Sequence, residues 1–309
     1  MIATTGFFDG VHAGHRHVIE RLVSTAHARG DESLVVTFWP HPRAVLQDGA
    51  RELRLLTTLE EKKALLSGLG VDRVEVLEFS RTFASLRAEE YLRDILQERF
   101  GVTALLMGYD NRLGSDRLTA ASLAPVAGRL GMELIELPPL SFRAEPEAES
   151  RNLEISSTRI RGALEEGNIE EASRMLGYPY SLRGAVVAGN HLGRTIGFPT
   201  ANMQLYEPLK LVPLRGVYVV EAQVLGRNWR GMTNIGTRPT VGGTIPTIET
   251  HILDFDEDIY GLPLTIRFLR RLRDEIRFPS LDALKAQLAL DAQDARTGDF
   301  SAGNSYLSK

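Results

Sequence analysis

The chain has 309 residues, of which 43% are hydrophobic, with no cysteine and a formal net charge of -4 at pH 7. This length predicts a globular protein with room for two domains, and the absence of cysteine excludes disulfides, thiolate metal sites and a cysteine nucleophile. Without a signal-peptide pattern, a membrane-length apolar run or an overall basic field, we expect a cytoplasmic protein that binds neither membrane nor nucleic acid.

The first part of the chain, as far as Pro138, alternates short apolar runs with helical patterns. After an apolar start at Ile2, the runs that predict strands are 33–39, 71–79, 102–108 and 132–137. A helix is expected from about His15 to Arg29, a second after the capping box Thr57-x-x-Glu60, and a third that ends at Gly101. This alternation predicts an α/β fold with a doubly wound parallel sheet.

The turn after the first strand concentrates glycine, histidine and one carboxylate in the stretch TTGFFDGVHAGH, residues 4–15. Such a turn, entering a helix, points unpaired N–H groups and a positive dipole end outward, which favours phosphate binding. Gly6 and Gly14 leave room for a phosphate, His12 and His15 can donate to its oxygens, and Asp9 could orient a substrate group or Mg²⁺. A zinc site and a purely structural turn are the alternatives.

Beyond Pro138 the pattern changes. The range 138–152 predicts a loop, and helices are expected over 157–166 and, capped by Asn168-x-x-Glu171, as far as Met175. The later runs that predict strands are 181–189, 216–226, 229–236, 247–255 and 264–273, as in a small antiparallel β-barrel. A final helix over 280–296 places Leu281, Leu284 and Leu288 on the stripe expected to face the barrel. The predicted domains are 1–178 and 179–309.

Three stretches of the first domain resemble one family. GFFDGVHAGH resembles the His-x-Gly-His signature of nucleotidyltransferases in the form found in bifunctional riboflavin kinase/FAD synthetases, and GYDNRLGSDR (108–117) and ISSTRIRGAL (155–164) resemble two further motifs of that family. The resemblance implies catalytic roles for His12 and His15. It implies ATP binding by Gly6, Phe8, Asp9, Gly14, Asp110, Ser156, Ser157, Thr158 and Arg161. Independently, the Ser-Ser-Thr run predicts a helix N-cap, and Arg159 and Arg161 in that first turn oppose the helix dipole unless an anion binds there.

The stretch GNHLGRTIGFPTANM (189–203) resembles the flavokinase motif of the same family. Its glycines allow close backbone approach, and Thr200 and Asn202 offer neutral oxygens suited to a Mg²⁺ that carries nucleotide phosphates, although a plain turn after a proline is the alternative. The resemblance implies ATP or flavin binding by Gly189, Gly193, Arg194, Gly197, Pro199, Thr200, Asn202 and Asn234, with Thr200 and Asn202 on the metal. It also implies that Glu249 is the general base. His251 shares its strand face and is expected to be packed or exposed.

The resemblance implies that the second domain phosphorylates riboflavin to FMN with MgATP and that the first transfers AMP from ATP to FMN, giving FAD and pyrophosphate. Riboflavin, FMN and ATP are then the partners of a monomer or weak homo-oligomer. Two departures stand in the first domain: Phe7 replaces the usual Asn, and Asn111-Arg112-Leu113 replaces Phe-Arg-Phe. They favour a first alternative, a monofunctional riboflavin kinase with a non-catalytic first domain. A flavin- or RNA-binding regulator, suggested by the arginines within 266–278, is the second.

Overall fold

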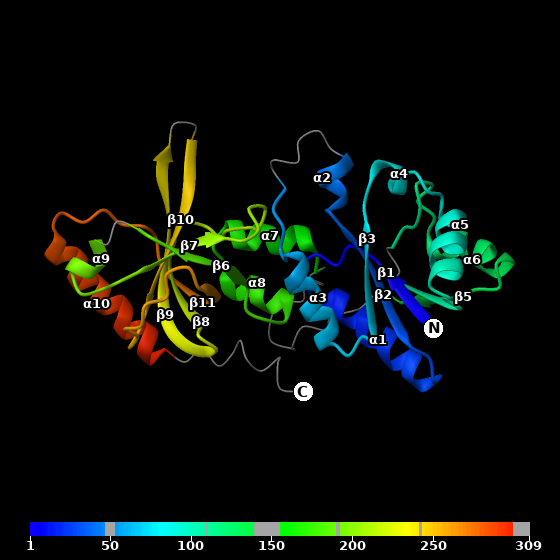
Figure 1. Cartoon of the computed structure of the whole chain (residues 1–309), viewed down its shortest axis with the longest axis horizontal. Helices are drawn as coiled ribbons and strands as arrows, with labels where there is room; N and C mark the ends of the chain where they lie inside the picture. Colours follow the sequence, from blue (N-terminus) through cyan, green and yellow to red (C-terminus); the bar gives the residue numbers. More distant parts are fainter. Residues whose placement is uncertain (47–52, 109–110, 139–154, 190–191, 241–242, 299–309) are drawn as a thin grey trace, which may run out of the picture. The chain divides into compact units, whose positions relative to one another are not determined.

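The computed structural model describes residues 1–46, 53–108, 111–138, 155–189, 192–240 and 243–298. The chain divides into two compact units, Met1–Ser156 and Ser157–Lys309 (Figure 1). The loop expected over 138–152 lies almost wholly outside the described residues. Helices α7 (Ser157–Glu165) and α8 (Ile169–Leu176), which the sequence analysis grouped with the first domain, fall in unit 2, because they pack on one another and α8 packs against a strand of that unit.

Unit 1 contains a parallel sheet in the order β3-β2-β1-β4-β5, which confirms the predicted doubly wound α/β fold. Its strands are β1 (Ile2–Thr5), β2 (Ser33–Trp39), β3 (Arg73–Glu78), β4 (Ala104–Gly108) and β5 (Glu133–Leu137). Its helices are α1 (Ala13–Ala28), α2 (Pro42–Leu46), α3 (Leu59–Gly68), α4 (Arg81–Ala84), α5 (Ala88–Glu90), the π-helical η2 (Tyr91–Arg99) and α6 (Ala120–Arg129).

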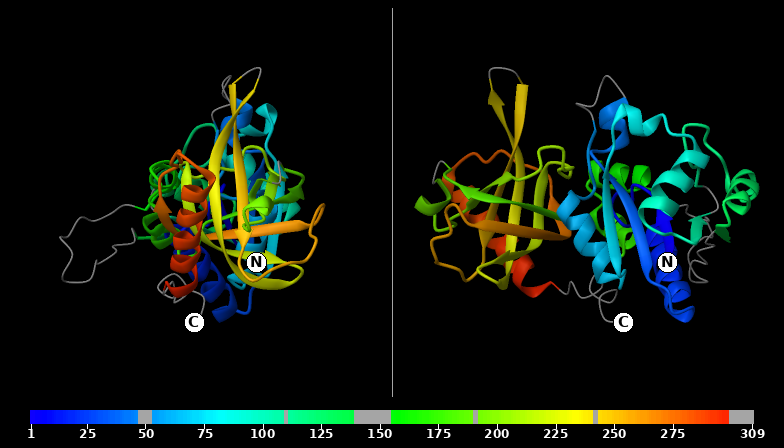
Figure 2. Two further views of the ribbon diagram at one scale, coloured as in Figure 1. Left: turned by 90° about the vertical axis from the view of Figure 1, so that its left-hand side faces the viewer. Right: turned by 45° about the vertical axis from the view of Figure 1, so that its right-hand side comes forward.

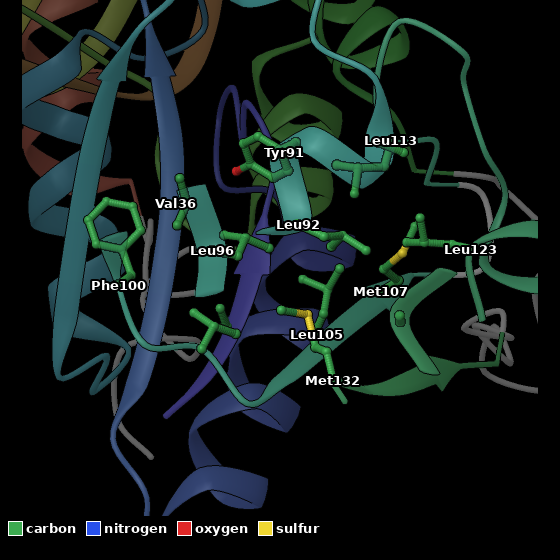
Figure 3. Close-up of a cluster of buried hydrophobic side chains, with 14 of the residues drawn as sticks. Val36, Tyr91, Leu92, Leu96, Phe100, Leu105, Met107, Leu113, Leu123 and Met132 are labelled. Carbon is green, nitrogen blue, oxygen red and sulfur yellow. The ribbon is translucent and has the colours of Figure 1, made fainter. Parts of the chain in front are cut away.

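Hydrophobic clusters cover both faces of the sheet because successive strand residues point to opposite sides. Ile2 and Leu106 pack with α1 and α3 on one face, whereas Leu105 and Met107 pack with η2 and α6 on the other. Figure 3 shows the second cluster, with the side chains of η2 directed toward those of β4. The sheet is thereby a rigid platform for the loops at its carboxyl edge.

The strand order fixes where a ligand site is expected. The chain passes from β1 to β2 and β3 on one side, and β4 then returns to the other side of β1. This switch point between β1 and β4 is where doubly wound sheets bind ligands. The side-chain amide of Asn111, just after β4, donates to the carbonyl oxygen of Thr5 at 3.2 Å and so bridges the two strand ends.

The capping box at the start of α3 lies one residue later than predicted. The hydroxyl of Thr58 accepts from the amide of Glu61 at 3.1 Å, and the Glu61 carboxylate accepts from the amide of Thr58 at 2.9 Å. Thr57 has a different role, because its hydroxyl accepts from the amide of Gly10 in the β1–α1 turn. The two neighbouring threonines made both registers possible, and this contact with the turn selects the observed one.

Unit 2 is a closed barrel in the order β10-β7-β6-β11-β8-β9, as the strand pattern predicted. Its elements are β6 (Ser181–Val187), α9 (Leu192–Thr195), β7 (Ala201–Leu205), β8 (Gly216–Val224), β9 (Arg227–Thr240), β10 (Gly243–Ile252), β11 (Pro263–Arg273) and α10 (Leu281–Thr297). Strand β7 was not predicted. It begins inside the glycine-rich motif, where the turn residues obscure the strand pattern.

Helix α10 packs along the barrel (Figure 2), but its apolar stripe begins later than predicted. Leu288, Ala292 and Ala295 pack against the outer side of β8 and β9, whereas Leu281 is 56% exposed, so its predicted contact with the barrel is wrong. A buried ion pair fixes the helix: the guanidinium of Arg273 donates to the carboxylate of Asp291, with a shortest distance of 2.7 Å. This pair anchors α10 to the end of β11.

Candidate active sites

The turn between β1 and α1 has an unusual backbone. Phe8 and Val11 have φ values of 53° and 36°, and Gly10, between them, has 81°. A positive φ is strained for a bulky or β-branched residue, and such strain persists only where the surroundings enforce it, often at functional sites. Here both side chains are buried in the cluster that includes Leu22 and Leu66. The core therefore fixes the conformation of the turn.

Asp9 is buried in this turn, with 4% of its surface exposed. Its carboxylate accepts from the backbone amides of Leu56 and Thr57, at 3.1 Å each, and from the Thr57 hydroxyl at 3.3 Å. These bonds hold the segment before α3 against the turn. The carboxylate thus has a structural role here, and its binding of ATP stays a prediction, as does that of Phe8, whose ring is buried.

His12 and His15 lie side by side at the N-terminus of α1. His12 is the N-cap, and its Nδ1 accepts from the amide of His15 at 3.4 Å, which places the proton of the neutral ring on Nε2. The two rings are stacked, with centroids 3.7 Å apart and planes 16° apart, and the edge of the Phe8 ring lies against His15. The structure therefore brings both predicted histidines together.

Burial lowers the pKa of His15 well below its usual value, and the nearby charges of His12 and Lys62 lower it further. His15 is consequently a neutral imidazole at pH 7. Its Nδ1 is shielded from solvent and has no hydrogen-bond partner among the residues that the structure describes. A neutral ring can donate one hydrogen bond, so the pair can present N–H groups to an anion next to the helix dipole.

Among the other predicted ATP-binding residues, Gly6 lies in this turn and Gly14 lies in the first turn of α1. Asp110 lies outside the described residues. Ser157, Thr158 and Arg161 open α7 in unit 2, next to Ser156, and their contact with ATP stays a prediction.

One expectation for α7 and α8 needs correction and one stays a prediction. The guanidinium of Arg159 binds the carboxylate of Glu171 at 2.9 Å, so a carboxylate of the protein itself offsets its conflict with the helix dipole, and anion binding beside Arg161 stays a prediction. Asn168 is the N-cap of α8, but its side chain makes no capping hydrogen bond, and its amide donates to Glu166 instead. The predicted Asn168-x-x-Glu171 cap therefore does not form, because Glu171 is engaged by Arg159.

In unit 2, the strand register places Glu249 of β10 between two asparagines. It pairs with Asn202 of β7 on one side and with Asn234 of β9 on the other, and residues directly opposite in an antiparallel sheet point to the same face. The neighbouring positions point inward, where the hydroxyls of Thr233 and Thr250 share a hydrogen bond of 2.8 Å. Glu249 and both asparagines therefore face outward from the barrel.

A cavity of about 330 Å³ lies on this outer face, a size typical of small-molecule sites. The barrel contributes Glu249, Asn234 and Thr200 to its lining, and the segment after β11 contributes Glu275. Further lining residues are Gly193, Ile196, Phe198, Val217, Met232, His251, Arg273, Ile276, Phe278, Leu284 and Leu288. The lining thus combines carboxylates and small polar groups with many apolar side chains, which suits a ligand that carries polar groups on an aromatic ring system.

The glycine-rich motif folds back on itself beside this cavity. A Cβ on Gly189 would lie 2.1 Å from the side-chain amide of Asn202, and one on Gly193 would lie 2.2 Å from the carbonyl oxygen of Phe198. His251 adds a third tie, because its Nδ1 lies 2.7 Å from the carbonyl oxygen of Pro199, and burial lowers its pKa. His251 is therefore a packed residue, which agrees with the expectation for it, and it helps to hold Thr200 at the cavity.

The side chains fit a Mg²⁺ ion that arrives with nucleotide phosphates. Thr200 and Glu249 both line the cavity, and the absence of a side chain at Gly189 leaves room for the amide of Asn202. The structure shows no cluster of three or more His, Asp or Glu side chains suited to a metal among its described residues. In kinases, Mg²⁺ usually has few protein ligands, and phosphate oxygens of the nucleotide supply further ligands.

With the activity that the sequence resemblance implies for this domain, replacing Gly189 by alanine should lower riboflavin phosphorylation by roughly 10–100-fold, because the new methyl group displaces the amide of Asn202. The matched control is Gly162→Ala in α7, where the added Cβ meets no atom within 4 Å. The rate of FMN formation by each purified variant checks this. Equal rates for Gly189→Ala and the control would show that the position of Asn202 is unimportant.

The fold and the two candidate sites define a class of protein, a transferase of two units. One unit has a glycine- and histidine-rich turn suited to phosphate on an α/β sheet, and the other has a cavity lined by carboxylates on a β-barrel. A family model described as FAD synthetase matches residues 1–158, and one described as riboflavin kinase matches residues 176–298. The chain belongs to the bifunctional riboflavin kinase/FMN adenylyltransferase family.

Curated relatives with that name cover nearly the whole chain. The one from Pseudomonas fluorescens is 40% identical over 296 residues, which are 96% of this chain and 92% of the relative. The one from Escherichia coli strain K12 is 38% identical over 297 residues, which are 96% of this chain and 91% of the relative. Both halves of the chain thus share their order and extent with these relatives.

A solved structure from Streptococcus pneumoniae, titled a macrolide-efflux protein, is 34% identical, has a TM-score of 0.87, and covers 96% of this chain and 94% of its own. It therefore shares the fold of this chain along almost the full length. None of the helices among the described residues of this chain is long and apolar enough to cross a membrane.

Proposed function

We propose that this chain converts riboflavin to FMN at the barrel cavity and FMN to FAD at the β1–α1 turn. The observation that supports the proposal is that the chain has two separate candidate sites, one in each unit. Glu249 lies between two asparagines at a cavity of suitable size, and His12 and His15 are stacked at a strand-to-helix turn. The two matching family models and the names of the relatives support the same assignment.

In the first reaction, the 5′-hydroxyl oxygen of riboflavin attacks the γ-phosphorus of ATP, and ADP leaves. Glu249 takes the proton of the hydroxyl group as general base. Its place on the cavity wall supports this role, because a base must lie beside the reacting oxygen. Thr200 and Asn202 would hold Mg²⁺, which when bound neutralises charge on the β- and γ-phosphates.

In the second reaction, a phosphate oxygen of FMN attacks the α-phosphorus of ATP, the bond to the β-phosphate oxygen breaks, and pyrophosphate leaves. The attacking oxygen is already ionised, so no general base is needed. His12 and His15 donate hydrogen bonds to phosphoryl oxygens, and the N-terminus of α1 adds a favourable dipole. Their fixed geometry lowers the cost of orienting the phosphates during transfer.

The proposal includes the finer assignments. Residues 1–178 serve adenylyl transfer and 179–309 serve phosphorylation, in a cytoplasmic monomer or weak homo-oligomer that works on small molecules and not on nucleic acid. A net charge of -4 and the absence of cysteine support this setting.

The test is to incubate the purified chain with riboflavin, Mg²⁺ and ATP and to separate the flavins by chromatography. FMN is expected first and FAD afterwards. With FMN supplied directly, FAD should form without a lag. Formation of FMN alone would contradict the adenylyltransferase half of the proposal, and formation of neither product would contradict both halves.

A further inference from the structure

Lys62 is a buried cation beneath the β1–α1 turn, and no sequence pattern indicated its burial. It lies in α3 with only 1% of its surface exposed. Its Nζ donates to the carbonyl oxygen of Phe7 at 3.0 Å and to that of Phe38 at 3.4 Å. The same nitrogen lies 3.9 Å from the centroid of the Phe7 ring, a distance typical of a cation–π contact.

Burying a lysine ammonium is costly, because the charge loses its hydration and here gains uncharged partners. A methionine or leucine would fill the same volume at lower cost. This burial lowers the pKa of Lys62 to about 8, although the charge of Asp9 acts in the opposite direction. A side chain that costs stability and lies next to a candidate active site is more easily explained by function than by packing.

The contacts of Lys62 join the strand ends that position the histidines. Phe7 belongs to the turn after β1, and Phe38 is near the carboxyl end of β2, so the ammonium group ties these two strands together. The residue after Phe7 is Phe8, whose ring edge lies against the ring of His15. Lys62 is therefore linked to His15 through the backbone of the turn.

Three titratable groups near the β1–α1 turn interact with Lys62 or with one another. The carboxylate of Asp9 attracts the ammonium group, and the positive charge of Lys62 lowers the pKa of His15, which lies next to His12. On its own helix, Glu61 is engaged by the amide of Thr58. Phe7, which replaces the usual Asn of the family, gives the ammonium group an aromatic face.

We propose that Lys62 is a positioning residue for adenylyl transfer, which fixes the end of β1 to the end of β2 and keeps a positive charge beneath His12 and His15. The proposal rests on the proposed adenylyltransferase function of unit 1. The fixed charge favours the negative charge that develops on departing pyrophosphate, and the tie to Phe7 keeps the histidines in their stacked arrangement.

The first experiment compares Lys62→Met with Lys63→Met in the full chain. Lys63 is the next residue of α3 and is exposed, so its variant is the matched control. We expect Lys62→Met to lower kcat for FMN adenylylation by roughly tenfold or more, and Lys63→Met to leave it unchanged. Riboflavin phosphorylation in the same samples should be unaffected by either substitution. Wild-type adenylylation in Lys62→Met would overturn the proposal, whereas a wild-type chain that forms no FAD would overturn the proposed function instead.

A second readout separates positioning from mere packing. In Lys62→Met the titration of the His15 ring, followed by NMR, should move to higher pH, because a nearby positive charge that lowers its pKa is gone. An unchanged His15 titration would contradict the proposal.

Should Lys62→Met fail to fold, the Lys62→Arg variant tests the proposal instead, because arginine keeps its charge at high pH. Adenylylation by the wild-type chain should fall above about pH 8, and Lys62→Arg should lack that fall. The same fall in both chains would overturn the proposal.

The pH dependence of stability has a defined sign. The pKa of Lys62 is about 8 in the folded chain and about 10.5 in the unfolded chain, so between these values only the unfolded chain holds the proton. The free energy of unfolding should therefore gain a contribution that rises with pH from about 8 to 10.5. Chemical denaturation of wild-type and Lys62→Met chains across this range should show that contribution in the wild type alone.

Discussion

Replacing Glu249 by glutamine is expected to slow riboflavin phosphorylation by roughly 10²–10⁴-fold, because the amide cannot accept the proton of the attacking hydroxyl group. The substitution keeps the size of the side chain, so the cavity and the neighbouring asparagines should stay in place. Adenylylation of FMN supplied directly should be retained, since that site lies on unit 1. Initial rates of both reactions, measured on one preparation, check the prediction.

The matched control is Glu257→Gln. Glu257 is also acidic and in unit 2, but its carboxylate is exposed and binds the guanidinium of Arg227 at 2.6 Å, away from the cavity lining. Its variant should phosphorylate riboflavin at the wild-type rate. A Glu249→Gln chain that keeps the wild-type phosphorylation rate would remove Glu249 from the mechanism.

The second large effect is expected at the stacked histidines. Substituting His12 or His15 by alanine should lower FMN adenylylation by roughly 10²–10³-fold, the cost typical of losing one fixed donor to a developing negative charge. The fold-loss of adenylylation in the double variant should be much smaller than the product of the two single fold-losses, because the rings hold one another in position. Steady-state kinetics with FMN and ATP tests both statements.

His27→Ala is the control, because His27 lies in the last turn of the same helix and pairs with Asp72 at an exposed position. It should adenylylate FMN normally. All histidine variants should phosphorylate riboflavin at the wild-type rate. Fully additive losses in the double variant would show that the two rings act independently.

Much of the fold was predictable from local patterns. The observed bounds of β2 match the predicted run 33–39, because buried parallel strands are continuous apolar runs between turn residues. Both candidate sites were also indicated by short stretches of sequence. Residues 4–15 combine glycines with two histidines, and residues 189–203 combine glycines with a proline-containing turn and polar side chains. The pairing of Glu249 with two asparagines follows from the barrel register, which no single stretch of sequence reveals.

The features that were missed depend on tertiary contacts. Nothing in the pattern of α3 distinguishes the buried Lys62 from the exposed Lys63, because only the packing of that helix beneath the turn separates them. The role of Asp9 toward a substrate group or Mg²⁺ stays a prediction, but no local pattern indicated that its carboxylate accepts from amides 47 and 48 residues away. Leu281 fits the apolar stripe of α10, but its side chain is 56% exposed.

The most direct measurement uses ATP labelled with ³²P at either the α- or the γ-position, with riboflavin as the only flavin supplied. Label from the γ-position should enter FMN and remain in FAD, whereas label from the α-position should appear in FAD and never in FMN. This pattern requires phosphoryl transfer at one site and adenylyl transfer at another. Flavins that carry no label from the α-position, or FMN that does carry it, would contradict the assignment of two distinct reactions to this chain.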